Sequence, residues 1–265
     1  MKKIVALILV LALLIALGAR ERCVPMGIEF DGTNDQILYP YTETIAGLSA
    51  MTIISQITID TIPNDSTRRP IVRRQDNAQV NTAWELALVD AADGDVIAFV
   101  LNYSGGGGDK TSAANITVGR RFVAVTTDFS SANKHKLYID GAEVTYLTEE
   151  TNTGTRYSEA SPAGTSVGSN FAVTQVIDGT LHSVLIYNRI LSAQEILDAY
   201  NSKLAIPTTR GLVFAPHLCG AAGLQTFDGA TLGGTNYIID QISGAQGTPS
   251  GSPIGRADTY LTFDN

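Results

Sequence analysis

Hydrophobic positions along this chain recur in short runs at two-residue spacing, and glycine-, asparagine- and aspartate-rich turns separate the runs. Residues 50–62 alternate apolar and polar side chains over most of their length, and residues 27–40 contain two shorter runs around an Asp-Gly turn. Alternation of this kind is typical of strands that bury one face. The pattern predicts an all-β sandwich or barrel.

Two further Asp-Gly pairs predict hairpins, because this dipeptide suits tight two-residue turns. One pair lies between residues 83–89 and 96–103, and the other lies between residues 136–139 and 144–147. Residues 149–166 are rich in Glu, Thr, Asn, Ser and Gly, so we expect an exposed loop there.

One short helix is expected after the strand that contains residues 181–187. Ser192 precedes Glu195 by three residues, the spacing of a capping box, and Leu191 and Ile196 are placed to form a hydrophobic staple. The apolar stripe of this helix is predicted to comprise Ile196, Leu197 and Tyr200.

Residues 1–22 have the layout of an export signal, with two lysines, an apolar run over residues 4–19 and small residues at its end. The run is shorter than the roughly 20 residues of a membrane-spanning helix. A cleaved signal is therefore favoured, and a retained N-terminal hydrophobic anchor is the alternative. We expect one sandwich over residues 27–204, with residues 205–265 supplying strands that complete it or contact a neighbouring subunit.

The formal net charge is −8 and no basic stripe is present, so nucleic acid is not an expected partner. The chain has two cysteines, Cys23 and Cys219. In an exported protein they are candidates for a disulfide, and two unpaired thiols are the alternative.

Three stretches resemble laminin-G-like domains of the concanavalin A-like lectin/glucanase superfamily. Lys136-Leu-Tyr-Ile-Asp-Gly resembles the family's LYVDG hairpin, residues 181–200 resemble its closing strand and helix, and Glu29-Phe-Asp-Gly resembles its FDG strand. The resemblance covers about residues 27–204. It implies a two-sheet antiparallel jelly-roll sandwich with one concave face. It also implies glycan or protein binding, through Ca²⁺ in some members, and catalysis in a minority.

The sequence carries little sign of catalysis. The hydrolases of the resembled family place Glu-x-Asp-x-x-Glu on one strand, and no such string occurs here. The acidic pairs Glu149-Glu150 and Asp93/Asp95 lie in turn-like sequence. There is no His-Glu-x-x-His motif, and the three histidines are His135, His182 and His217. We therefore expect no enzyme.

Two acidic loops are candidate calcium sites, because carboxylate and amide oxygens are the usual ligands of this ion. Neither loop has EF-hand spacing, and ordinary turn chemistry explains both equally well. The candidates are Asp31, Asn34 and Asp35 in the first loop, and Asp93 and Asp95 with Asp90 in the second.

Aromatic side chains are the candidates for ligand contact, since sugar sites use an aromatic platform with polar groups around it. Trp84 is the only tryptophan, and a place in the core is its alternative role. Tyr39, Tyr41 and Tyr103 stand near predicted strand ends.

The sequence thus predicts a non-catalytic recognition or adhesion module that binds a glycan or a surface protein and is secreted or held at the cell surface. The alternative is a structural subunit of a virion, surface filament or surface layer that assembles with its own copies through the sandwich and the C-terminal strands. Contact with a membrane is expected only through residues 4–19, if these are retained.

Overall fold

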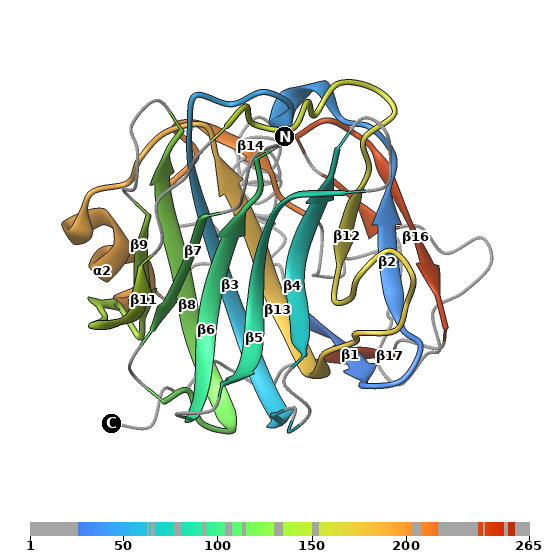
Figure 1. The fold of residues 1–265 in the computed structure, drawn as a ribbon. Helices are drawn as coiled ribbons and strands as arrows, with labels where there is room; N and C mark the ends of the chain where they lie inside the picture. Colours follow the sequence, from blue (N-terminus) through green and yellow to red (C-terminus); the bar gives the residue numbers. More distant parts are fainter. Residues whose placement is uncertain are drawn as a thin grey trace, which may run out of the picture.

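The computed structural model describes residues 26–62, 64, 67–76, 81–91, 94–103, 108–112, 115–129, 135–149, 154–202, 208–216, 238–240, 242–251 and 254–257. They form two antiparallel sheets packed face to face, with one α-helix at the side (Figure 1). The predicted all-β sandwich is confirmed. The expected leader and both cysteines lie outside the described residues, within which no helix is long and apolar enough to cross a membrane.

One sheet has eight strands. Its order is β10 (Ala142–Glu143), β9 (Lys136–Ile139), β8 (Gly119–Asp128), β3 (Ala50–Thr61), β13 (Asp178–Tyr187), β1 (Met26–Asp31) and β17 (Ile254–Ala257), with β14 (Leu212–Phe214) paired to part of β13. The predicted long strand at residues 50–62 is β3, which lies at the centre of this sheet between β8 and β13.

The other sheet has nine strands. Its order is β11 (Tyr146–Glu149), β7 (Gly108–Ser112), β6 (Gly94–Leu101), β5 (Thr82–Ala91), β4 (Arg68–Gln75), β12 (Thr165–Val167), β2 (Gln36–Tyr39), β16 (Gln246–Ser250) and β15 (Ile238–Ile239). A short 3-10 helix, η1 (Glu43–Ile45), follows β2, and α2 (Ala193–Asn201) follows β13.

Of the two predicted hairpins, the first is confirmed and the second has a different second strand. β5 and β6 form the expected hairpin. β1 and β2 are both strands, yet they lie in different sheets. The Asp140-Gly141 turn has φ values of 49° and 81°, as a type I′ turn requires, but it pairs β9 with β10. β11 crosses to the other sheet and pairs with β7.

Strand alternation divides the apolar side chains between two cores. The larger core fills the space between the sheets and includes Phe30, Trp84, Phe99 and Phe214. The second lies on the outer side of the eight-stranded sheet, where α2 covers side chains of β3, β8 and β13. The α2 stripe consists of Ile196, Ala199 and Tyr200, while Leu197 is 38% exposed. The prediction for Leu197 was wrong, since one position adds about 100° around a helix and turns it from the sheet.

The predicted capping box at the start of α2 is confirmed. The Ser192 hydroxyl accepts a hydrogen bond from Glu195 N at 3.2 Å, and the Glu195 carboxylate accepts one from Ser192 N at 2.9 Å. Arg189 also holds this carboxylate with both terminal nitrogens, at 2.7 and 3.0 Å. The Arg189 hydrogen bonds, followed by the Ser192 N–H, lower the pKa of Glu195 to about 2.

Glu195→Gln should lower the free energy of unfolding at neutral pH by about 1 kcal/mol, the usual size of a lost cap interaction. A carboxylate with a lowered folded-state pKa stabilises the fold above its unfolded pKa, and this contribution disappears as pH falls through the folded value. The cost of Glu195→Gln should therefore shrink between pH 5 and pH 2, as measured by urea denaturation of both proteins. A cost independent of pH would contradict this account.

Candidate functional site

The outer face of the nine-stranded sheet carries a row of polar side chains across its centre. Cα pairing places Arg73 of β4 between Ser166 of β12 and Glu85 of β5, and Glu85 is paired in turn with Val100 of β6. Neighbouring positions of these strands, such as Val72 and Leu86, belong to the inter-sheet core. Because side chains alternate along a strand, the row faces away from that core.

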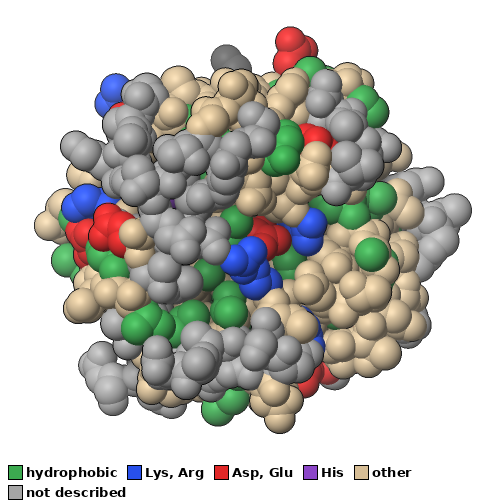
Figure 2. All heavy atoms as spheres, viewed as in Figure 1, with side chains coloured by type: hydrophobic (Ala, Val, Ile, Leu, Met, Phe, Trp, Pro, Cys, Tyr) green, Lys and Arg blue, Asp and Glu red, His purple; other side chains and the backbone are tan. Residues whose placement is uncertain are grey.

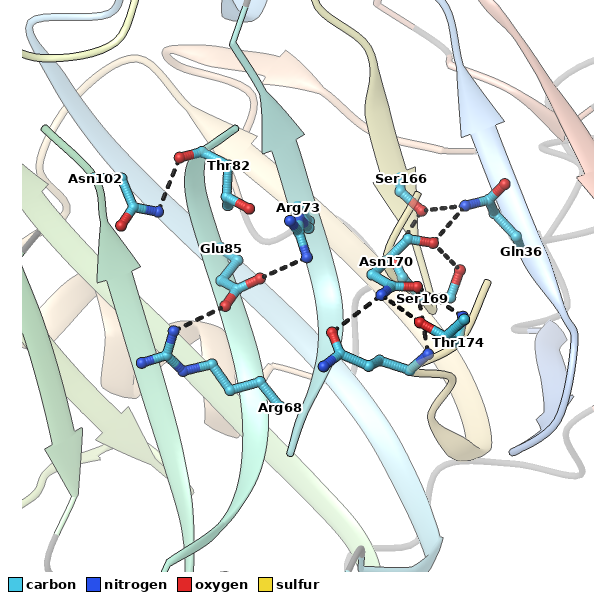
Figure 3. A network of polar contacts seen from close by, with 11 residues as sticks. Gln36, Arg68, Arg73, Thr82, Glu85, Asn102, Ser166, Ser169, Asn170 and Thr174 are labelled. Carbon is cyan, nitrogen blue, oxygen red and sulfur yellow. Dashed lines mark hydrogen bonds and ion pairs between the residues drawn. The ribbon is translucent and has the colours of Figure 1, made fainter. Parts of the chain in front are cut away.

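Two arginines flank the Glu85 carboxylate within this row (Figure 3). Arg68 Nη1 lies 3.6 Å from Glu85 Oε1, and Arg73 Nη1 lies 3.6 Å from Glu85 Oε2. The side chains of Arg68 and Arg73 are 40% and 21% exposed, whereas that of Glu85 is 5% exposed. Burial lowers the pKa of Arg73, Glu85 acts to raise it and Arg68 acts to lower it. The guanidiniums therefore form the accessible part of the cluster.

Small apolar side chains surround this cluster on the same face. Ala87 and Ala98 are paired across β5 and β6, and Pro70 is paired with Ala87 from β4. Figure 2 shows hydrophobic side chains beside the blue and red groups at the middle of the face. Ala87 and Ala98 are 0% and 1% exposed and Pro70 is buried as well, so the arginines are the accessible groups at the middle of this face.

A tight loop stands beside the row, after β12. Asn170 holds it together: its Oδ1 accepts from the backbone N–H groups of Thr174 and Gln175, at 2.9 and 3.3 Å, and its Nδ2 donates to both side chains. From β2, Gln36 Nε2 donates to Ser166 Oγ and Asn170 O (Figure 3). Val173 in this loop has a φ of 54°, which is strained for a β-branched residue. The loop thus forms an ordered border of the face.

Residues 164–168, Gly-Thr-Ser-Val-Gly, have the spacing of a nucleophile elbow, a match that the sequence analysis missed. The structure excludes that role. An elbow places its serine on a turn between a strand and a helix, but Ser166 lies within β12. Its hydroxyl is fully buried and donates to Ser169 O at 2.7 Å.

A separate pocket of about 350 Å³ opens at the end of the sandwich, lined by Tyr41, Ala46, Gly47, Arg156, Tyr157, Ser158, Glu159 and Ala160. Figure 1 shows the segment before β12 running beside η1, and the pocket lies between these two parts of the chain. The two tyrosines are half-buried. Residues 149–166 were predicted as an exposed loop. This is wrong for Glu159, which is 3% exposed, and for residues 163–166, which are buried and lead into β12.

The carboxylate of Glu159 can be buried because it neutralises two arginines, Arg74 and Arg156. These ion pairs are not evident from the sequence. The Glu159 carboxylate lies 3.8 Å from Arg74 Nε, accepts a hydrogen bond from Trp84 Nε1 at 3.1 Å and forms an ion pair with Arg156. Burial lowers the pKa of Arg74, while Glu159 and Tyr41 act in the opposite direction. These contacts attach the wall of the pocket to the core.

The aromatic residues proposed from the sequence have different positions. Trp84 and Tyr39 are fully buried in the inter-sheet core, so neither offers a surface to a ligand. Tyr103 packs partly against that core, and its backbone forms an isolated antiparallel β-bridge with Arg156 of the pocket wall. Tyr41 lines the pocket itself. The burial of Tyr39 follows from β2, where it alternates with the outward-facing Leu38.

The first acidic loop is used for turn hydrogen bonds. Asp31 Oδ1 accepts from Thr33 N, and Asp35 Oδ2 accepts from Asp31 N, both at 2.9 Å. In the described part of the chain, no group of three or more His, Cys, Asp or Glu side chains is placed to hold a metal. Asp93, the side chains of Asp90 and Asp95, and His217 lie outside that part.

His135 and His182 occupy structural positions rather than an exposed cluster. His135 Nδ1 lies 2.6 Å from Thr127 Oγ1, and its ring packs against Phe99. His182 of β13 is half-buried, with Nε2 at 2.8 Å from Thr58 Oγ1.

The two packed antiparallel sheets define a lectin-like sandwich. Residues 31–197 match the family model of the concanavalin A-like lectin/glucanases superfamily, laminin G type. Since this match covers more than half of the chain, the protein belongs to that family. The predicted resemblance is confirmed.

Two solved structures show the same fold at low sequence identity. A SAP-like pentraxin from Limulus polyphemus is 15% identical, with a TM-score of 0.55, covering 72% of this chain and 88% of that chain. A Bacteroides ovatus protein described as carbohydrate-binding is 15% identical, with a TM-score of 0.62. The match covers 92% of this chain but 63% of the Bacteroides protein. No protein with a curated description matches the sequence.

Glu159→Gln should lower the free energy of unfolding by about 3–5 kcal/mol, because it leaves buried guanidinium charge without compensation. Glu143→Gln is the matched control, since Glu143 pairs with Lys136 at 2.8 Å on the surface. That change should cost about 1 kcal/mol or less. Urea denaturation measures both, and equal costs would show that Glu159 does not neutralise the buried arginines.

Proposed function

We propose that this protein is a non-catalytic, extracellular recognition or adhesion module that binds a glycan or a protein on the outer face of its nine-stranded sheet. The observation that carries the proposal is the Arg68–Glu85–Arg73 cluster at the centre of that face. It presents partly exposed guanidinium donors on a face where the side chains of Ala87, Ala98 and Val100 are buried, and the Asn170 loop borders it. Ligand sites rely on a few precisely placed polar groups of this kind to fix the orientation of the ligand.

The position of Glu85 supports binding over catalysis. Glycoside hydrolysis needs two carboxyl groups that flank the scissile bond. The side chain of Glu85 is 5% exposed, and each of its oxygens faces an arginine. A ligand above the sheet therefore meets the guanidiniums before it meets this carboxylate.

The fold neighbours support a glycan as the ligand. The Bacteroides ovatus protein that shares the fold is described as carbohydrate-binding, and the family name itself includes lectins. The same family name includes glucanases, so an enzyme assay belongs in the test.

A structural subunit remains the second candidate, because β17 ends its sheet within the described residues and edge strands can pair with other chains. The C-terminal strands favour the recognition module. β14, β16 and β17 pair with β13, β2 and β1 of their own chain, so they are already engaged.

The test is a glycan array and a panel of cell-surface proteins, probed with the full chain and with Arg73→Gln. Loss of the guanidinium should weaken binding of any hit at least about tenfold, which corresponds to about 1.4 kcal/mol. Thr58→Gln is the control, because Thr58 lies on the outer side of the other sheet, where it contacts His182. It should leave affinity unchanged.

Thermal unfolding of each variant separates loss of folding from loss of binding. A ligand that binds Arg73→Gln as well as the natural protein would contradict the proposed face. Hydrolysis of any polysaccharide in a matched panel would overturn the non-catalytic assignment. Regular polymers in negative-stain images, without binding to either panel, would favour the structural subunit.

A further inference from the structure

We propose that the pocket at the end of the sandwich binds an extended, proline-containing segment of a partner protein, with a prolyl ring packed against Tyr41 and Tyr157. The pocket shares no residue with the Arg68–Glu85–Arg73 cluster, so the inference goes beyond the proposed function and does not depend on it. Extended proline-rich segments dock into aromatic-lined grooves, because their conformation is already formed before binding. The pocket volume of about 350 Å³ is large enough for a prolyl ring and the peptide groups beside it.

The two tyrosines are the first support. Both are half-buried, and neither hydroxyl forms a hydrogen bond with another described residue. Tyrosine hydroxyls that are largely removed from water usually find a hydrogen-bond partner. A bound peptide would supply carbonyl oxygens to these hydroxyls and an apolar ring to the aromatic faces.

The neutral lining of the pocket is the second support. Arg156 and Glu159 are the only charged side chains that line it, and they form an ion pair with each other. Arg156 also donates from Nη1 to Leu48 O at 2.7 Å, and Glu159 accepts from Trp84 Nε1 at 3.1 Å. Since both charges are already engaged within the protein, the pocket favours an uncharged ligand.

The shortage of side-chain acceptors is the third support, and it favours a peptide over a sugar. Apart from the two tyrosines and the ion pair, the lining consists of Ala46, Gly47, Ser158 and Ala160, none of which has a carboxylate or an amide in its side chain. The Ser158 hydroxyl already accepts from Ala160 N at 3.4 Å. A sugar brings several hydroxyl donors that need acceptors, whereas a prolyl residue has a carbonyl acceptor and no N–H group.

Contacts with the core hold the pocket in place, which reduces the entropic cost of binding. The Tyr41 ring centroid lies 5.6 Å from the guanidinium carbon of the buried Arg74, and Tyr157 packs partly against the inter-sheet core. The guanidinium carbon of Arg156 lies 3.7 Å from the centroid of the Phe129 ring. The aromatic walls are therefore fixed before a ligand arrives, as a rigid extended segment requires.

Calorimetric titration of the full chain with three uncharged probes tests the proposal. The probes are a peptide of ten prolines with blocked ends, a ten-residue Gly-Ser repeat with blocked ends and a neutral oligosaccharide. The proline peptide should bind at least about tenfold more tightly than the Gly-Ser peptide. Its affinity should not change when the salt concentration is raised, because screening acts on exposed charges and none takes part.

Two variants locate the binding site. Tyr157→Phe removes one hydroxyl and keeps the ring, so it should weaken binding of the proline peptide about fivefold, the size of one net hydrogen bond. Ala160→Leu places a larger apolar side chain in the pocket and should weaken binding at least about tenfold. Tyr200→Phe is the matched control, because Tyr200 packs against Phe122 on the outer side of the eight-stranded sheet, and it should leave affinity unchanged.

Thermal unfolding checks that each variant folds. Equal affinity for the two peptides, or unchanged affinity in both Tyr157→Phe and Ala160→Leu, would overturn the inference. Tighter binding of the oligosaccharide than of the proline peptide, with loss of that binding in Ala160→Leu, would also overturn it in favour of a glycan pocket. Arg73→Gln separates the inference from the proposed function: this variant should lose ligands of the sheet face and still bind the proline peptide. Loss of peptide binding in Arg73→Gln would contradict the assignment to the pocket.

Discussion

The fold depends on the neutralisation of one buried guanidinium, that of Arg74, whose side chain has no exposed surface. An isolated charge in that position would be strongly destabilising. Glu159 supplies the opposite charge, Thr165 accepts a hydrogen bond from Nη1, and the carbonyl of Thr42 accepts one from Nη2. One charge therefore connects β4, β12, the segment after β2 and the segment that forms the pocket wall.

The same strand places a second arginine on the opposite side of the sheet. Arg73 and Arg74 are adjacent in sequence, so the pleat directs one toward the solvent face and the other toward the core. Arg74 is satisfied within the protein, whereas Arg73 lies at a distance of 3.6 Å from its carboxylate partner. The candidate site and the most constrained part of the core thus share strand β4.

Local sequence patterns predicted the elements better than their pairing. The α2 capping box, the β5–β6 hairpin and the β3 strand depend on neighbouring residues and were correct. The separation of β1 from β2, the crossing of β11 and the burial of Glu159 depend on contacts distant in sequence. The candidate site could not be predicted for the same reason. Arg68, Arg73 and Glu85 can be read from the sequence, but only the β4–β5 register places Glu85 beside both arginines.

The pairing of strands from the two ends of the described chain has a consequence for the order of folding. β1 lies between β13 and β17, and β2 lies between β12 and β16. During synthesis both N-terminal strands must wait for partners that are made much later, β17 last of all. Contacts this distant in sequence slow folding and leave strand edges unpaired in the meantime. The period before β16 and β17 emerge is therefore when the protein is most exposed to aggregation.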